Sequence, residues 1–212
     1  MSLKGITGKH TAVIYSLFPT PIYSNQLNRN FTQSELSLVE EFKKKCVSNP
    51  GNITSRDNYI LNHKNFKKLK LNIEYFLQDY FDKIVCPSRD VKFYITQSWL
   101  NYTKANEFHH EHEHANSYLS GVLYFNADDK FDKISFLKKV YNQITVETKN
   151  FNIYNSDAWW ISIKTGQILI FPSRTTHLVK RKKEDNTRIS LAFNTFLKGD
   201  LGTIRSLTEL KL

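Results

Sequence analysis

The chain has 212 residues, of which 40% are hydrophobic and 14% aromatic, and this composition excludes a disordered or low-complexity protein. The length suits one domain with a sizeable core. No apolar run approaches the ~20 residues of a membrane-spanning helix, and the first residues lack the apolar segment of a secretory signal. The two cysteines, Cys46 and Cys86, make no disulfide framework, so we expect a cytoplasmic protein.

Basic residues outnumber acidic ones by 30 to 20, which gives a formal net charge of +10. Such an excess is one signature of nucleic-acid binding. The lysines, however, are spread along the whole chain, with short basic runs at residues 43–45 and 180–183. Dispersed lysine mainly serves solubility and weak electrostatic steering. Nucleic acid is therefore kept as a possible partner but is not favoured.

The first part of the chain is predicted to be extended and then mainly helical. Two prolines keep residues 18–23 out of a helix, because each disfavours helical geometry in its predecessor. Thr32 and Glu35 form a capping box that begins a helix. A second amphipathic helix is expected over residues 66–84. The apolar positions of the first helix are Leu36, Val39, Phe42 and Cys46, and the turn residues 49–52 are expected to end it.

The remainder consists of short alternating segments separated by polar turns, which is typical of β-strands. We expect a mainly β fold, a jelly roll packed against two or more helices on one sheet face. The chain is then one domain, 1–212, with mostly helical support in 1–90, a β core in 91–197 and a tail in 198–212. The predicted strands are residues 91–102, 117–125, 133–137, 144–147, 159–163, 167–171, 177–181 and 188–196.

Histidines are concentrated in residues 107–114, and a further one, His177, lies far along the chain. On an extended strand, side chains two residues apart project from the same face. A His-x-His or His-x-Glu pair and a distant third ligand would form a facial triad that leaves three positions of an octahedral metal open. That arrangement is typical of non-haem Fe(II), whereas structural zinc sites are closed and usually rich in cysteine.

Arg188 and Ser190 share one face of the last predicted strand. A hairpin centred on residues 184–186 would place His177 opposite Ala192, about 13 Å from Arg188 at about 3.3 Å per residue. The planar guanidinium can donate two parallel hydrogen bonds to a carboxylate. A five-carbon diacid bound to the metal could therefore reach Arg188.

Six motifs follow one another in the second half of the chain: Trp99-Leu100-Asn101-Tyr102, His112-x-His114-x-Asn116-Ser117, LSGVLYF at residues 119–125, Gly166-x(4)-Phe171-Pro172-Ser173, His177-x-Val179 and Arg188-Ile189-Ser190-x(2)-Phe193-Asn194. In this order they resemble the 2-oxoglutarate- and Fe(II)-dependent oxygenases of marine bacteriophages and some bacteria, distant relatives of the prolyl hydroxylases. The resemblance covers residues 92–197, and residues 18–23 are similar to the family's N-terminal stretch.

The resemblance implies a double-stranded β-helix and an enzyme that uses Fe(II), O₂ and 2-oxoglutarate. Decarboxylation of 2-oxoglutarate would be coupled to oxidation of a C–H bond in a small-molecule or peptidyl substrate, by analogy a prolyl residue. If the protein is phage-encoded, it would act in the host cytoplasm. Carried over by position, His112 and His177 bind the metal, and the contacts to 2-oxoglutarate are Tyr102, Tyr124, Arg188 and Ser190.

The third metal ligand departs from the family pattern. Where the superfamily has a carboxylate two residues after the first histidine, this chain has His114. We prefer a three-histidine site, because His112 and His114 share one strand face. Two alternatives stay open: a slipped pair His109-x-Glu111, and an out-of-register contact from Glu111 or Glu113.

Two other functions are compatible with the same residues. One is a metal-binding jelly-roll module without catalysis, which would not bind 2-oxoglutarate. The other is a cupin-type dioxygenase that uses three histidines and needs only Fe(II) and O₂. Trp99, Trp159 and Trp160 are candidates for the cavity mouth, and alternation is expected to place one of the paired tryptophans in the core and the other outside.

Overall fold

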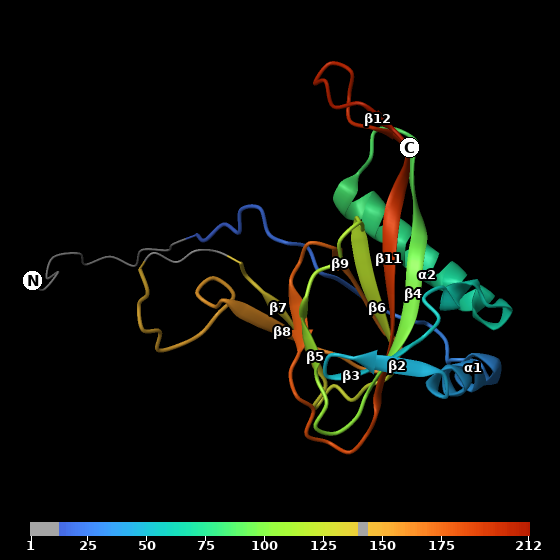
Figure 1. Ribbon diagram of the computed structural model, residues 1–212. Coiled ribbons are helices and arrows are strands. Elements are labelled where there is room, and N and C mark those ends of the chain that lie inside the picture. Colours follow the sequence, from blue (N-terminus) through green and yellow to red (C-terminus); the bar gives the residue numbers. More distant parts are fainter. Residues whose placement is uncertain (1–12, 140–143) are drawn as a thin grey trace, which may run out of the picture.

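Two antiparallel β-sheets face one another in the structure, a computed structural model that describes residues 13–139 and 144–212 (Figure 1). The larger sheet has the order β1-β9-β6-β11-β4-β3-β2, with β12 paired to β11, and the smaller has the order β5-β10-β7-β8. The jelly roll predicted from the sequence is confirmed. The strands are β1 (Tyr23–Gln26), β2 (Cys46–Asn49), β3 (Asn52–Ser55), β4 (Val91–Thr103), β5 (His109–His112), β6 (Leu119–Asn126), β7 (Lys133–Leu137), β8 (Ala158–Ser162), β9 (Gln167–Pro172), β10 (His177–Val179), β11 (Arg188–Leu201) and β12 (Leu210–Lys211).

Both predicted helices are present. Helix α1 (Gln33–Lys43) begins at the predicted capping box, in which the Thr32 side chain accepts from the Glu35 backbone and the Glu35 side chain accepts from the Thr32 backbone. Helix α2 (Lys67–Tyr80) continues into a π-helical turn over Phe81–Val85. Short 3₁₀ helices at Ile60–Asn62 and Lys64–Phe66 precede α2. None of the helices in the described ranges is long and apolar enough to cross a membrane.

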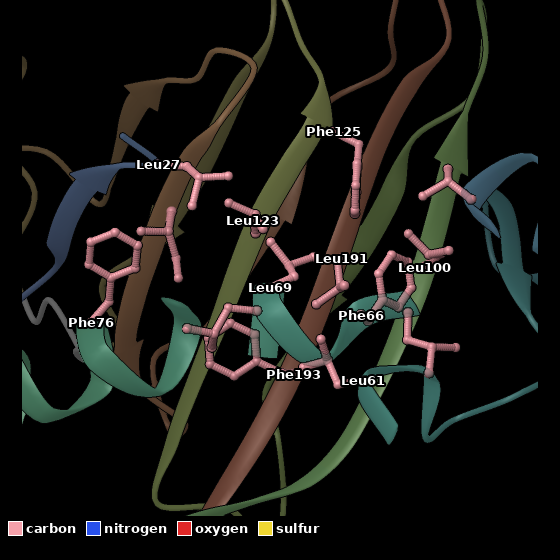
Figure 2. Close-up of a cluster of buried hydrophobic side chains, with 14 of the residues drawn as sticks. Leu27, Leu61, Phe66, Leu69, Phe76, Leu100, Leu123, Phe125, Leu191 and Phe193 are labelled. Carbon is pink, nitrogen blue, oxygen red and sulfur yellow. The ribbon is translucent and has the colours of Figure 1, made fainter. Parts of the chain in front are cut away.

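Helix α2 covers the outer face of the larger sheet (Figures 1 and 2). Its Leu69 and Leu77 are fully buried and belong to the same apolar cluster as Leu191 and Phe193 of β11. Burying a leucine or phenylalanine side chain contributes about 1.5–3 kcal/mol. This layer therefore holds β11 in place while leaving the other face of the sheet free to line a cavity.

Several predicted boundaries are wrong, because long-range strand pairing overrides local periodicity. Cys46 is not in α1 but in β2, and residues 49–52 join the hairpin β2–β3, which extends the larger sheet beside β4. The supporting half of the chain thus contributes three strands as well as the helices. Residues 144–147 form no strand, since this part of the loop between β7 and β8 pairs with no neighbouring strand.

The predicted hairpin between His177 and Arg188 is also wrong. Strand β10 pairs with β5 and β7 in the smaller sheet, whereas β11 pairs with β4 and β6 in the larger one. The connection between them crosses from one sheet to the other. The two residues are therefore brought together by the packing of the sheets and not by strand pairing.

Gly121 of β6 allows the Phe193 ring to pack directly against the backbone. A Cβ atom at residue 121 would lie 2.2 Å from Cζ of Phe193. We expect Gly121→Ala to destabilise the fold by about 1–3 kcal/mol, because the ring must move out of a packed core. Thermal or urea unfolding measures this. The double variant Gly121→Ala/Phe193→Leu should recover part of the loss, and an unchanged unfolding midpoint in Gly121→Ala would contradict the packing argument.

Candidate metal centre and adjoining cavity

Three histidines from the ends of two neighbouring strands converge at the open end of the smaller sheet. His112 at the end of β5 is in register with His177 at the start of β10. His114 follows two residues later, and its backbone N–H donates to the Ser173 carbonyl at 3.0 Å. One ligand nitrogen from each of the three imidazoles lies within 4.8 Å of the others. The predicted metal-ligand residues are therefore brought together.

Backbone carbonyls orient two of these rings. Nδ1 of His112 lies 2.8 Å from the His110 carbonyl oxygen, and Nδ1 of His177 lies 2.9 Å from that of Thr175. A carbonyl only accepts hydrogen bonds, so each Nδ1 carries the proton and each Nε2 keeps its lone pair. Metal-binding histidines are commonly fixed in this tautomer by such a contact.

Burial keeps the three rings neutral. It lowers the pKa of His114 to about 3 and that of His177 to about 4, with further lowering from the neighbouring imidazoles. The pKa of His112 is also lowered, mainly by burial. Neutral imidazole is the form that binds a metal. The donor set of this group suits a divalent transition metal such as iron.

The carboxylates considered as alternative ligands lie outside the group of potential ligands. Glu111 is exposed on β5. Glu113 accepts a hydrogen bond from the Thr176 hydroxyl at 2.6 Å and pairs with Lys139. Neither belongs to a cluster of potential ligands in the described part of the chain. This placement favours the three-histidine interpretation over both carboxylate interpretations.

His109 belongs to a second group, with His110, that shares His112 with the first. Its Nδ1 lies 3.4 Å from the Asn52 side-chain amide, which in turn donates to Thr103. Burial and the neighbouring histidines lower the pKa of His109 to about 2. His109 therefore lines the same cavity as Arg188, as a neutral ring.

The cavity extends from the three histidines to Arg188 and is lined by both sheets. Arg188 is 3% exposed. Its Nη2 donates to the Thr103 hydroxyl at 3.2 Å, and its Nη1 lies 3.9 Å from Asp132. Asp132 is also 3.6 Å from the buried Lys182. Two buried cations thus share one buried carboxylate, and Arg188 keeps spare N–H donors for an anion in the cavity.

Tyr124 and Ser190 face the same cavity from paired positions on β6 and β11. Burial raises the pKa of Tyr124, so its hydroxyl is a neutral hydrogen-bond donor. Asn101 of β4 pairs with Ser190, and its buried Oδ1 has no partner among the described residues. Sequence reasoning missed Asn101, although its alternation with Trp99 and Thr103 was a usable signal.

Tyr102 is not in the cavity, and the prediction that it contacts 2-oxoglutarate is wrong. Its hydroxyl donates to the Val39 carbonyl at 2.6 Å, and its ring lies in the apolar cluster under the helices. Strand β4 alternates without interruption here, so Asn101 and Thr103 face the cavity and Tyr102 faces α1. Tyr102 and His112 are ten residues apart, and in one continuous strand they would share a face. They do not, because β4 and β5 belong to different sheets.

The tryptophans are also divided between different places. Trp99 lines the cavity, with its ring centroid 5.8 Å from that of His114. Trp159 and Trp160 on β8 are 39% and 50% exposed and stack on each other. The expectation that one of them lies in the core is wrong, and neither lines the metal cavity.

Residues 97–194, which contain these cavity residues, match the family model described as "Putative 2OG-Fe(II) oxygenase". Over these residues the chain is similar to the 2OG-Fe(II) oxygenase family. By its description, this family uses Fe(II) and 2-oxoglutarate. No curated protein sequence matched the chain.

Solved structures share this fold. The non-heme alpha ketoglutarate dependent epimerase SnoN from nogalamycin biosynthesis is similar with a TM-score of 0.61 and 11% identity, over 84% of this chain and 76% of SnoN. HygX from Streptomyces hygroscopicus, with nickel, 2-oxoglutarate and hygromycin B bound, gives 0.54 and 12%, over 83% and 82%. A Pseudomonas putida prolyl-4-hydroxylase gives 0.52 and 12%, over 82% and 92%. At these identities the likeness establishes the fold.

The neutral histidine cluster predicts a pH dependence of stability in the metal-free protein. The folded-state pKa of His177 is about 4 instead of 6.5, so between these values the unfolded state binds more protons. The free energy of unfolding should therefore fall as the pH drops from about 6.5 towards about 4. Urea unfolding in the presence of a chelator measures it. The variant His114→Gln/His177→Gln should show a shallower fall, and an unchanged slope would contradict burial of neutral rings.

Proposed function

We propose that His112, His114 and His177 hold one Fe(II) and that 2-oxoglutarate binds along the cavity between this group and Arg188. One observation carries this proposal: three neutral imidazoles and a buried guanidinium, supplied by both sheets, face a single cavity. The protein would then oxidise a C–H bond of a substrate that reaches the metal from the open end.

The protein's own residues prepare the metal site. Carbonyls of His110 and Thr175 hold two rings in the metal-binding tautomer before any metal arrives. Three neutral ligands do not offset the charge of a divalent ion, so the site favours an anionic cosubstrate beside it. When bound, Fe(II) and 2-oxoglutarate supply the O₂-dependent oxidation that yields succinate and CO₂.

Arg188 is suited to hold the far carboxylate of 2-oxoglutarate. Its planar fork is buried, so a charge-assisted pair there is weakly screened by water. Asp132 holds the guanidinium from behind, and the hydroxyls of Ser190 and Tyr124 add donors along the cavity. Asn101 lines the same cavity, and its side-chain oxygen, which has no partner among the described residues, is free to accept a hydrogen bond from a hydroxyl or N–H group there.

A prolyl residue is the substrate predicted by analogy with the prolyl hydroxylases. The prediction of a prolyl substrate has one support, the fold shared with the Pseudomonas putida prolyl-4-hydroxylase. That likeness concerns the fold alone, so a prolyl substrate stays a prediction. The phage origin and the cytoplasmic location also stay predictions from the sequence.

The third ligand is tested by His114→Ala against Glu111→Ala. A three-histidine site should lose stoichiometric Fe(II) in His114→Ala and in His177→Ala, because each removes one of three metal bonds. Glu111→Ala is the matched control, since Glu111 is exposed, and it should keep its iron. Anaerobic Fe(II) titration followed by calorimetry measures this, with circular dichroism as the folding check. Loss of iron in Glu111→Ala with retention in His114→Ala would establish a carboxylate triad instead.

The carboxylate clamp is tested by Arg188→Ala. Losing one charged partner in a buried site costs about 2–5 kcal/mol. At 1.4 kcal/mol per tenfold, the dissociation constant of 2-oxoglutarate should rise roughly 30-fold or more, with Fe(II) affinity nearly unchanged. The weak visible charge-transfer band of the chelate, recorded anaerobically, reports the binding.

Two further variants keep this test informative if Arg188→Ala does not fold. Tyr124→Phe should weaken 2-oxoglutarate binding, whereas Tyr102→Phe should leave it unchanged, because the Tyr102 hydroxyl binds Val39 on the helix side. Weaker iron binding with unchanged 2-oxoglutarate binding in Arg188→Ala would reverse the proposed roles. A protein that binds iron but never 2-oxoglutarate would be a metal-binding module or a dioxygenase of the cupin type.

A further inference from the structure

A second concave surface lies beside the metal cavity and shares Val179 and Arg188 with it. We call this surface the basic groove. It is lined by residues 130–133, 179–184, Ser135, Trp160 and Arg188, and it has a volume of about 410 Å³. It is formed where the start of β7, the exposed side of β8 and the connection from β10 to β11 meet. Two basic segments that are about fifty residues apart in the sequence, 130–133 and 180–183, therefore line one surface.

The basic groove carries a large excess of positive charge. Seven basic side chains and two carboxylates line it. Both carboxylates are already engaged, since Asp132 and Glu184 lie 3.6 Å and 3.4 Å from the buried Lys182. The five other cations apart from Arg188 and Lys182 are exposed, and none makes an ion pair within the described ranges: Lys130, Lys133, Lys180, Arg181 and Lys183.

Two exposed aromatic rings, Trp160 and Phe131, also line the basic groove. Trp160 is 50% exposed, and Nζ of Lys133 lies 5.4 Å from its ring centroid. Phe131 is 53% exposed at the same groove. Neither ring belongs to an apolar core cluster of the described residues, so both are available to a partner that approaches the exposed cations.

We propose that the basic groove binds single-stranded nucleic acid. The exposed cations would contact successive phosphates, and Trp160 and Phe131 would stack on unpaired bases, the combination by which single strands are held without base-specific contacts. A duplex keeps its bases stacked inside and offers these rings nothing. An acidic peptide satisfies the charges but leaves the aromatic faces uncovered. The proposal does not depend on the proposed iron chemistry.

The test measures binding of a fluorescein-labelled oligothymidylate of twelve nucleotides by anisotropy, as a function of salt. Lys180→Ser/Lys183→Ser should weaken binding tenfold or more and reduce the slope of log K against log salt by roughly 1.4, at about 0.7 for each phosphate contact. The matched control is Lys67→Ser/Lys68→Ser, which removes the same charge from the exposed start of α2 and should change binding less than twofold.

The aromatic part is tested by Trp160→Leu, which should weaken binding roughly fivefold or more, as expected for loss of one stacked base. Tyr75→Leu, which alters an exposed ring on α2, is its control and should have no effect. Equal losses in the two lysine pairs would show binding through net charge alone and overturn the proposal. Polyglutamate that binds as tightly as the oligonucleotide, or thymidine monophosphate that does so, would overturn it in favour of a peptide or a mononucleotide.

Discussion

Strand β11 is hydrogen-bonded along both edges, to β4 and to β6, and its side chains alternate between two environments. Leu191 and Phe193 face α2 and belong to the apolar core, whereas Arg188 and Ser190 face the cavity. A shift of one residue in this pairing would exchange the two sets, burying a guanidinium among leucines. The core and the cavity are therefore fixed by the same register, and the packing of α2 on the sheet indirectly positions Arg188, the proposed contact for the far carboxylate of 2-oxoglutarate.

The smaller sheet supplies the complementary constraint. Its register places His112 opposite His177, and the contact from His114 to Ser173 brings in the third imidazole. The three rings are neutral because they are buried, and two of them, His112 and His177, are oriented by backbone carbonyls. The opposite wall is charged, with Arg188 and Lys182 around Asp132. The cavity has three neutral imidazoles, potential metal ligands, at one end and an excess of positive charge at the other. It is well matched to an anion that extends from one end to the other.

Charge gathers on the outside of the same region. Lysines that are dispersed in the sequence come together because the connection from β10 to β11 must cross between the sheets and passes the start of β7. The two carboxylates of this region, Asp132 and Glu184, lie beside the buried Lys182. The exposed lysines of the basic groove and Arg181 therefore make no ion pair within the described residues. Part of the positive charge of the chain is thus concentrated in the basic groove. The groove lies next to the metal cavity, and Arg188 lines both.

The sequence by itself determined the local features. Alternation predicted most strands, the capping box predicted the start of α1, and the face shared by Arg188 and Ser190 was correctly read from their spacing. The tertiary structure decided which faces meet. In the tertiary structure Tyr102 lies in the core, and Asn101 lines the cavity instead. His177 and Arg188 lie in different sheets, and distant basic segments meet in the basic groove. Periodicity within a strand records only which side chains share a face, whereas the partner of that face is chosen by pairing between residues far apart in the chain.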